Sequence, residues 1–374
     1  MSSPEPRSRS RQAVLTVAVA DAASTCGSRI ADLLHASTAD PDSLIGEVIA
    51  LAPERGEATG VRWLTADPSS PTVVAALGDV DVLVWVAQQT DLESVIGRPR
   101  RDRRERRERT VRTAQALVMG AAAAGVRHVV VVTSATVYGA TAATPVPLPE
   151  DAPLAGTRDD GLVGDLLAVE DVLVEARRVH AAPQITVVRP AALVGTGIDT
   201  VLTRHFEAPR LLAVSGARPA WQFCHLDDLA TAVRAVVAGS LGPVVTVGSD
   251  GVLQQEQVER LSGMRRIELS EATALGTAQQ LHRVGVLPTP ASELTCVLHP
   301  WAVSSATLVA HGWQPAYDNE TCLGVLLHEI RGRHALAARR VDRKDAALGA
   351  ASAAVALVAT AALLRRARGT RAAK

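Results

Sequence analysis

Residues 129–139 read V-V-V-V-T-S-A-T-V-Y-G, a run of four valines that leads into a loop with hydroxyl side chains. A continuous apolar run of this kind predicts a strand buried on both faces of a parallel sheet. Further β-branched runs stand at residues 14–20, 47–51, 80–87 and 184–189, and helix-favouring stretches at residues 28–36, 110–124 and 164–181. The alternation of strand and helix predicts a doubly wound α/β sheet.

The composition indicates a folded protein of balanced charge. The 374 residues are 47% hydrophobic and 21% charged, with 39 basic and 39 acidic side chains, so disorder and a basic nucleic-acid-binding protein are both disfavoured. The cysteines lack C-x-x-C spacing, which argues for reduced thiols and against a metal site or disulfide scaffold; they are Cys26, Cys224, Cys296 and Cys322.

Composition also divides the chain into segments. We predict a loose tail, the sheet domain, a smaller proline-punctuated lobe, a basic linker, a hydrophobic helix and a basic tail, at residues 1–12, 13–190, 191–332, 333–345, 346–364 and 365–374. Residues 98–112 are rich in arginine but include acidic residues at helical spacing. This pattern favours a solvated helix face with i,i+4 pairs over a nucleic-acid surface.

Residues 346–364 carry no charge and would be about 28 Å long as a helix, close to the thickness of a bilayer core. We therefore predict that this stretch is a C-terminal transmembrane helix. Because we find no export signal, we expect it to anchor the protein at the cytoplasmic face of the cell membrane. The stretch is mostly alanine, which inserts weakly. The alternative is therefore a helix packed on the protein or a partner, in a soluble cytoplasmic chain.

Six segments together resemble the extended short-chain dehydrogenase/reductases, the family of NAD-dependent nucleotide-sugar epimerases and dehydratases. They are the S-A-T-V-Y-G loop after the valines, A-G-V-R-H at 124–128, T-A-D-P at 65–68, V-R-P at 188–190 with Gly195, H-L-D-D-L at 225–229 and G-W-Q-P at 312–315. The resemblance covers about residues 14–331. It implies a Rossmann-like fold with a dinucleotide across the carboxyl edge of the sheet and a sugar nucleotide beneath the second lobe. The cofactor-binding candidates are then Gly27, Asp67, Ala87, Ser134 and Pro190.

The family's phosphate-binding glycines are largely missing. Residues 20–27 read A-D-A-A-S-T-C-G, so only Gly27 is kept, and Asp21 sets a carboxylate where a diphosphate would approach. Ala52 replaces the acidic residue that would hold the ribose, although Arg55 stands near enough to meet a 2′-phosphate. We therefore expect that no cofactor binds. If one does bind, we expect it to be NAD(P).

The family's tyrosine and lysine pair is also missing. Alignment on the helix after the loop puts Leu162 at the tyrosine and Leu166 at the lysine, which leaves the hydroxyl of Ser134 without an acid or base to assist. A shifted register does not help, because the only lysines are Lys344 and Lys374.

The substrate side departs from the family as well. Trp221 stands where the family has a diphosphate-binding arginine, four residues before His225. The substrate-binding candidates are Arg189, Arg218 and His225. Arg204 and Arg218 could replace the missing arginine, or either could form a surface ion pair. His225 reads as a general base or, more simply, as a structural histidine at a helix start capped by Asp227 or Asp228.

Three functions fit these observations. The first is a catalytically silent, membrane-tethered binding or scaffolding module with an unknown protein partner. The second is an active NAD(P)-dependent epimerase, dehydratase or reductase that uses unorthodox acids such as Asp159, Asp160 or Asp165. The third is a sensor that binds a nucleotide or sugar nucleotide without turnover. By family analogy, a homodimer would form through residues 110–124 and 164–181.

Overall fold

The computed structural model describes residues 14–94, 100–179, 181–239, 241–283, 287, 289–331, 333, 335–336 and 339–340. A seven-stranded sheet forms the centre, with every neighbouring pair parallel, in the order β11-β6-β5-β4-β1-β2-β3. Its strands are β1 (Leu15–Ala20), β2 (Ile45–Ala52), β3 (Arg62–Thr65), β4 (Val82–Val86), β5 (His128–Val132), β6 (Gln184–Pro190) and β11 (Val244–Val247). The predicted parallel α/β sheet is confirmed.

Strand β5 shows why the valine run forms the centre of the sheet. Val129 and Val131 point into the core on one face, and Val130 and Val132 into the core on the other. Successive side chains of a strand alternate between faces, so a strand with helices on both sides buries the side chains of both faces and is mainly apolar. All five residues of β5 are buried.

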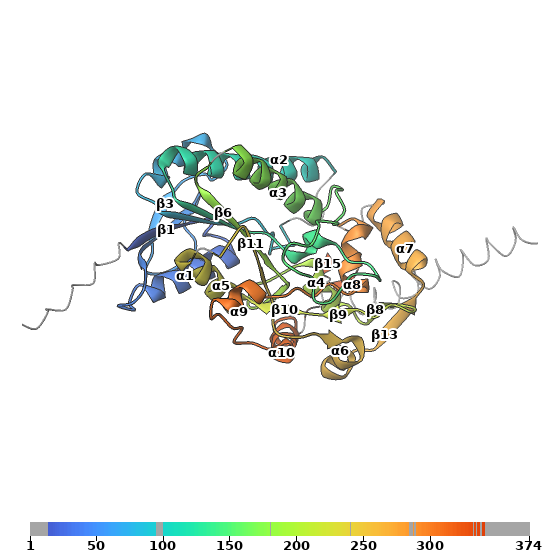
Figure 1. Ribbon diagram of the computed structural model, residues 1–374. Helices are drawn as coiled ribbons and strands as arrows, with labels where there is room; N and C mark the ends of the chain where they lie inside the picture. The colour runs from blue at the N-terminus through green and yellow to red at the C-terminus, as the bar shows by residue number, and fades with distance from the viewer. Residues whose placement is uncertain are drawn as a thin grey trace, which may run out of the picture.

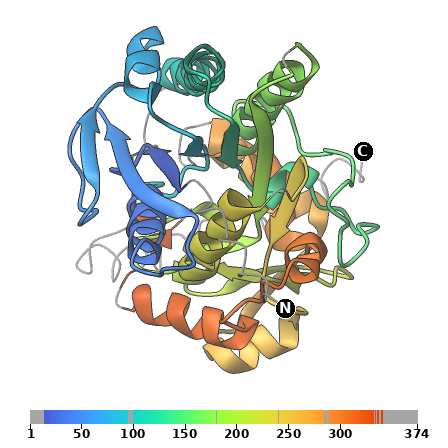
Figure 2. The ribbon, with the colours of Figure 1, turned by 60° about the vertical axis from the view of Figure 1, so that its left-hand side comes forward.

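Helices cover both faces of the sheet (Figure 1). On one face lie η1 (Pro71–Leu77), α2 (Arg100–Ala124) and α3 (Leu162–Val179), and on the other α1 (Thr25–Ser37) and α5 (Leu226–Ala238). The view in Figure 2 shows α1 below the sheet and α2 above it. A short turn, η2 (Ala135–Tyr138), follows β5.

The second lobe is built from short elements between and after these helices. Three two-stranded ladders pair β7 with β10, β8 with β13 and β9 with β12. Its elements are β7 (Ala192–Val194), α4 (Val201–Glu207), β8 (Leu211–Val214), β9 (Ala220–Trp221), β10 (Phe223–His225), β12 (Leu253–Gln254), α6 (Gln255–Ser262), β13 (Arg266–Leu269), α7 (Glu271–Arg283), η3 (Ala291–Leu294), α8 (Thr295–Leu298), α9 (Ala306–Ala310) and α10 (Asn319–Glu329), followed by β14 (Ala335–Leu336) and β15 (Arg339–Arg340). A division at residue 190 does not separate the two lobes completely, because β11 and α5 return to the main sheet.

Two of the family-like segments hold each other in place. The Asp228 carboxylate accepts hydrogen bonds from the amides of Ala316 and Tyr317 at 2.8 and 3.1 Å. The Trp313 indole donates to the Thr231 hydroxyl at 3.0 Å. The H-L-D-D-L helix start and the G-W-Q-P segment therefore have a structural reason to occur together.

None of the helices in the described part of the chain is long and apolar enough to cross a membrane. The predicted membrane helix at residues 346–364, the basic tail at 365–374 and the N-terminal tail at 1–12 all lie outside the described residues. The anchor at the cytoplasmic face of the membrane therefore stays a prediction.

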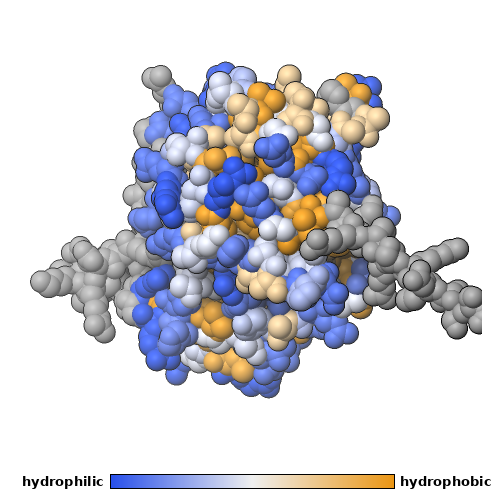
Figure 3. All heavy atoms as spheres, turned by 90° about the vertical axis from the view of Figure 1, so that its left-hand side faces the viewer, coloured by the Kyte–Doolittle hydropathy of each residue, from blue (hydrophilic) through white to orange (hydrophobic). Residues whose placement is uncertain are grey.

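Exposed hydrophobic residues are scattered over the surface. Figure 3 shows the left-hand side of the molecule in Figure 1, where they are interspersed among hydrophilic ones. Among the described residues, the large exposed hydrophobic side chains come from several parts of the chain, with two of them on α3: Val14, Met119, Val146, Val174, Val179, Leu261 and Val309. Hydrophobic residues exposed singly in this way are normal for a soluble surface.

Candidate functional site

The turn between β1 and α1 stands where a glycine-rich loop would admit a diphosphate. Asp21 has a φ of 60°, a left-handed conformation that glycine adopts freely and other residues rarely do. Burial raises the pKa of its carboxyl to about 6, although a hydrogen bond from Ser24 opposes the rise. The Ser24 hydroxyl caps α1 by accepting from the Gly27 amide at 3.1 Å. The helix end that binds phosphate in dinucleotide folds is thus served by the chain itself.

Gly27, the one motif glycine that is kept, has a packing role. A Cβ at this position would overlap the carbonyl oxygen of Asp21. The close approach of α1 to the turn therefore requires glycine here whether or not a cofactor binds.

The loop after β2 covers the neighbouring position, where the resemblance places a ribose. Ala52 is buried at the end of β2. Gly56 lies so close to the turn that a Cβ on it would stand 2.7 Å from the Cα of Ala23 and 3.1 Å from the ring of Trp63. Arg55 is exposed on this loop. Backbone therefore fills the space beside the turn.

Asp67 is used locally. Its carboxylate accepts hydrogen bonds from the amide and the hydroxyl of Ser69, at 2.9 and 2.8 Å, and these bonds hold its pKa below the ordinary value. The geometry is that of an aspartate closing its own turn.

A segment of the second lobe, residues 195–200, crosses the sheet edge above α1; we call it the strap. At Gly197 the strap touches α1, since a Cβ there would lie 3.1 Å from the Cγ2 of Thr25. Asp199 and Asp91 form a parallel β-bridge, in which the Leu92 amide donates to the Asp199 carbonyl at 3.0 Å. The strap and the loop after β4 are thus joined to each other beside the N-terminus of α1.

Arg204 of α4 secures the strap. Its side chain, which is 0% exposed, binds Asp199 at 2.7 and 2.6 Å and Glu93 at 2.6 Å. The sequence offered Arg204 as a phosphate ligand or a surface ion pair. The structure instead makes it a buried cross-link between the lobes, while Arg218 is exposed.

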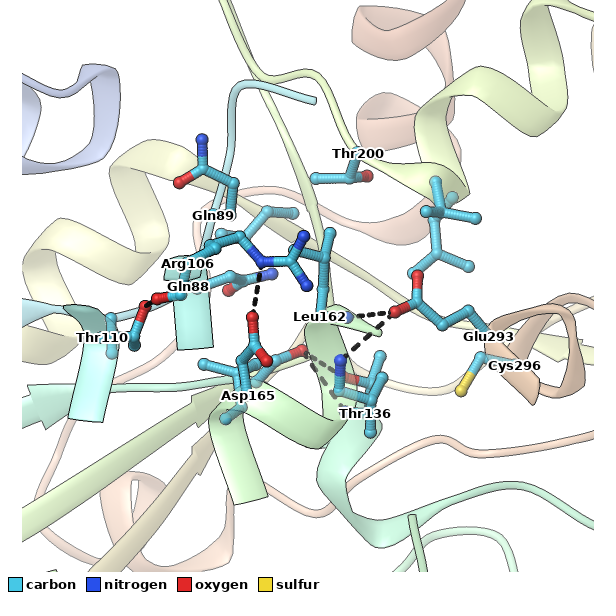
Figure 4. A pocket seen from close by; sticks show the side chains of 17 residues that line it. Gln88, Gln89, Arg106, Thr110, Thr136, Leu162, Asp165, Thr200, Glu293 and Cys296 are labelled. Atoms are coloured by element: carbon cyan, nitrogen blue, oxygen red, sulfur yellow. Dashed lines mark hydrogen bonds and ion pairs between the residues drawn. The ribbon is translucent and has the colours of Figure 1, made fainter. Parts of the chain in front are cut away.

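The corner where the resemblance places the tyrosine and lysine pair lies at the start of α3 (Figure 4). A cleft of about 100 Å³ is lined there by Ala87, Ser134, Leu162 and Leu166, among others. Small-molecule sites commonly enclose about 300–1,000 Å³. The Ser134 hydroxyl accepts from the amide and the hydroxyl of Thr136, at 3.3 and 3.0 Å. The two leucines present no proton donor or acceptor from their side chains, as the alignment predicts.

Arginines from α2 neutralise the acids of this corner. The Asp165 carboxylate binds Arg106 at 2.6 Å and Arg107 at 2.8 Å, and Asp160 binds Arg103 at 3.0 Å. Burial raises the pKa of Asp165 and both of its arginines oppose the rise. Two of the three acids considered as unorthodox catalysts are therefore held in ion pairs.

The arginine-rich segment is a helix, but only part of it matches the predicted pattern. Arg104 and Glu108 form the expected exposed i,i+4 pair at 2.9 Å. Arg103, Arg106 and Arg107 turn instead toward acids more than 50 positions away in the sequence. Helical spacing reports neighbours on one helix and carries no information about such tertiary partners.

Glu293 of η3 brings the second lobe to the start of α3, a contact that no motif in the sequence indicates. Its carboxylate accepts from the amides of Leu162 and Val163, the first two residues of α3. Burial raises its pKa to about 7, with the two amides opposing the rise. Beside it, the Ser292 hydroxyl donates to Asp159, the third acid considered.

Arg189 belongs to a buried network at the end of β6, next to Pro190. It forms an ion pair with Glu170 and donates to the Tyr138 hydroxyl at 2.8 Å. Tyr138 in turn donates to the backbone carbonyl of Glu150 at 2.7 Å. The charge of Arg189, a substrate-binding candidate, is therefore paired within the protein core.

His225 is structural in its contacts. It is itself the N-cap of α5, because its Nδ1 accepts from the Asp227 amide at 3.1 Å. Its ring stacks on Tyr317 with centroids 3.7 Å apart. Burial lowers its pKa, and Asp227 and Asp228 oppose the change. The cap is thus the histidine and not one of the aspartates suggested from the sequence.

Trp221, at the place of the missing arginine, is part of the core. It stacks between His205 and Phe223, with centroids 5.5 and 6.4 Å away. Its indole donates to Gln255 at 2.9 Å. Within the described residues, no group of His, Cys, Asp or Glu is arranged to hold a metal ion, and all four cysteines are buried and free.

The comparison with solved structures gives the fold. The dTDP-glucose 4,6-dehydratase DesIV of Streptomyces venezuelae, with NAD bound, is 17% identical, covers 85% of this chain and 97% of its own, and has a TM-score of 0.62. The UDP-glucose 4-epimerase of Thermotoga maritima is 13% identical, and the match covers 85% of this chain and 99% of the epimerase chain, with a TM-score of 0.60. An NAD-dependent NDP-hexosamine 5,6-dehydratase of tunicamycin biosynthesis is 18% identical. The match covers 85% of this chain and 98% of the dehydratase chain, with a TM-score of 0.60. The protein therefore has the fold of the extended short-chain dehydrogenase/reductases.

Comparison by sequence finds similarity over a smaller part of the chain. No protein-family model matches the chain. Uncharacterized proteins of Mycobacterium tuberculosis and Mycobacterium bovis are 30% identical over 142 residues, which is 38% of this chain and 38% of theirs.

Proposed function

We propose that this protein is a catalytically silent relative of the NAD-dependent epimerases and dehydratases, and that it serves as a binding or scaffolding module. One observation supports the proposal: Asp21, the loop at Gly56 and the strap crowd the turn between β1 and α1, where the resemblance places the dinucleotide. A diphosphate entering here would meet a carboxylate in a poorly solvated turn, and like charges repel strongly where water is scarce.

The loss of catalysis has separate support at the other corner. Leu162 and Leu166 replace the proton-transferring pair, and Arg103, Arg106 and Arg107 neutralise the nearby acids. General acid–base catalysis needs a group that is free to exchange its proton with the substrate. This argues against the active enzyme with unorthodox acids.

A thermal-shift experiment tests the proposal. NAD, NADH, NADP and NADPH at millimolar concentration should leave the melting temperature unchanged, because a ligand stabilises only in proportion to its binding. A purified NAD-binding epimerase serves as the positive control. A clear upward shift with any dinucleotide, or turnover of a nucleotide sugar, would overturn the proposal.

A sensor is the second candidate, and the cleft beside Ser134 favours it. The cleft is small but opens between the lobes, and Glu293 supplies it with an ionisable group. A sensor would show a thermal shift with a small ligand and no turnover, whereas a scaffold would respond only to a protein partner.

The membrane anchor at residues 346–364 is part of the proposal. Fractionation of the full chain and of a chain ending at residue 345 tests it. We expect the full chain in the membrane fraction and the shortened chain in the supernatant. Equal solubility of the two chains would contradict the predicted anchor.

The proposed homodimer would use the outer faces of α2 and α3. Met119 on α2 and Val174 on α3 are 66% and 58% exposed, which suits burial against a second copy. Light scattering should give twice the chain mass, and Met119→Glu should return the monomer. A wild-type protein that is monomeric at all accessible concentrations would contradict this.

A further inference from the structure

Glu293 joins the two lobes at a single buried point. It belongs to the second lobe, yet its carboxylate rests on the first two amides of α3 in the sheet domain. Only 6% of the residue is exposed. A Cβ on Gly161 would collide with this carboxylate, so the adjoining residue is one whose lack of a side chain permits the contact.

Charged and polar groups surround this carboxyl on every side. Asp159 lies in the loop before α3 and is bound by Ser292, next to Glu293 in the sequence. Arg106 comes from α2, where it and Arg107 are paired with Asp165 of α3. The Cys296 thiol of α8 is also close enough to interact. Arg106, whose positive charge acts on Glu293, is therefore already paired with another acid, while the charge of Asp159 repels an ionised Glu293.

We propose that Glu293 is a proton-controlled latch, which holds the second lobe firmly on α3 when its carboxyl is protonated and loosely when it is ionised. The ionised form keeps the hydrogen bonds from the α3 amides, so the lobes stay together. It loses stability because a charge is enclosed beside Asp159 with little water. Loosening would widen the neighbouring cleft, which Glu293 and Leu162 line from opposite lobes.

The direction of the effect follows from linkage. The docked carboxyl has a pKa of about 7, mainly through burial, against an ordinary value of 4.5. The docked state therefore holds the proton more tightly than the undocked state. Docking is strongest below about pH 4.5, weakens as the pH rises to about 7 and changes little above that.

Hydrogen exchange of the full chain measures the latch directly. After correction for intrinsic rates, the opening constant of the Leu162 and Val163 amides should rise on the order of tenfold between about pH 5.5 and about pH 7.5. The amides of β5, which report global unfolding, are the internal reference. Glu293→Gln keeps an oxygen to accept the hydrogen bonds but cannot ionise, so its opening constant should be the same at both pH values.

Two further variants complete the test. Glu57→Gln, at an exposed glutamate, is the matched control and should behave like the wild type. Asp159→Asn removes the repelling charge and should reduce the pH dependence, which keeps the proposal testable if Glu293→Gln fails to fold. A wild type with constant protection, a Glu293→Gln variant as pH-dependent as the wild type, or an Asp159→Asn variant with undiminished dependence would each overturn the latch.

Discussion

The two corners of the sheet edge depart in different ways from the pattern that the family resemblance implies. At the turn after β1, other parts of the chain occupy the space: the loop at Gly56 and the strap that Arg204 secures. At the start of α3, a cleft persists, and its acids are neutralised by arginines or buried against amides. Under the proposed function, packing of the chain closes the first corner and ion pairing of its acids silences the second. Steric closure depends on a few buried contacts, whereas neutralisation is shared among several groups.

The largest effect is expected from Arg204→Met, because it breaks the cross-link on which closure of the first corner depends. Removing one partner of a buried ion pair typically costs about 3–5 kcal/mol, since the remaining charge is left unpaired. Here Asp199 would be left buried, with its side chain 7% exposed. Urea unfolding followed by tryptophan fluorescence measures the loss.

The control for this variant is Glu93→Gln. The Glu93 side chain is 60% exposed, so the loss should stay below about 1 kcal/mol. If Arg204→Met lowered the free energy of unfolding no more than Glu93→Gln does, the stability of the strap would not depend on the buried ion pair.

Asp21→Gly should stabilise the protein by about 1–3 kcal/mol at pH 7, because it removes a carboxyl from a buried turn and a side chain from a left-handed residue. The folded pKa is raised from 3.8 to about 6. Ionisation therefore lowers stability as the pH rises from about 4 to about 6, and the penalty is complete above that. Thermal unfolding at pH 4 and pH 7 should show the larger gain at pH 7.

Asp21→Asn separates the two contributions, because it removes the charge and keeps a side chain that tolerates this backbone conformation. Neither variant should bind NAD while the strap and the Gly56 loop remain. A destabilised Asp21→Gly protein would refute the account of the turn, and NAD binding by it would show that the carboxylate alone kept the cofactor out.

The smallest effect is expected at the second corner, where neutralisation is shared. Arg106→Ala should cost about 1–2 kcal/mol, because Arg107 still pairs with Asp165. Arg104→Ala, in the exposed pair with Glu108, should cost about 0.5 kcal/mol or less. Equal losses for the two variants in chemical denaturation would mean that the tertiary pairs contribute no more than the exposed one.

The outline of the fold could be predicted from the sequence because its signals are local. Eight predicted segments, including the valine run, lie within or close to the elements observed, since strand and helix periodicity and apolar runs are properties of neighbouring residues. The short strand β3 was missed, because its four residues carry no apolar run. The arginine-rich segment was interpreted only in part, since Asp160 and Asp165, which pair with three of its arginines, lie outside this helix.

The absence of the family's glycines, tyrosine and lysine is visible in the sequence, since a missing side chain can be read without coordinates. The contacts around those positions come from the fold alone: a buried Arg204, a strap that contacts Thr25, and Glu293 hydrogen-bonded to a helix 130 positions away. Such contacts depend on which distant segments the fold brings together. Burial then sets the strength of their charges, and neither property is encoded in local spacing.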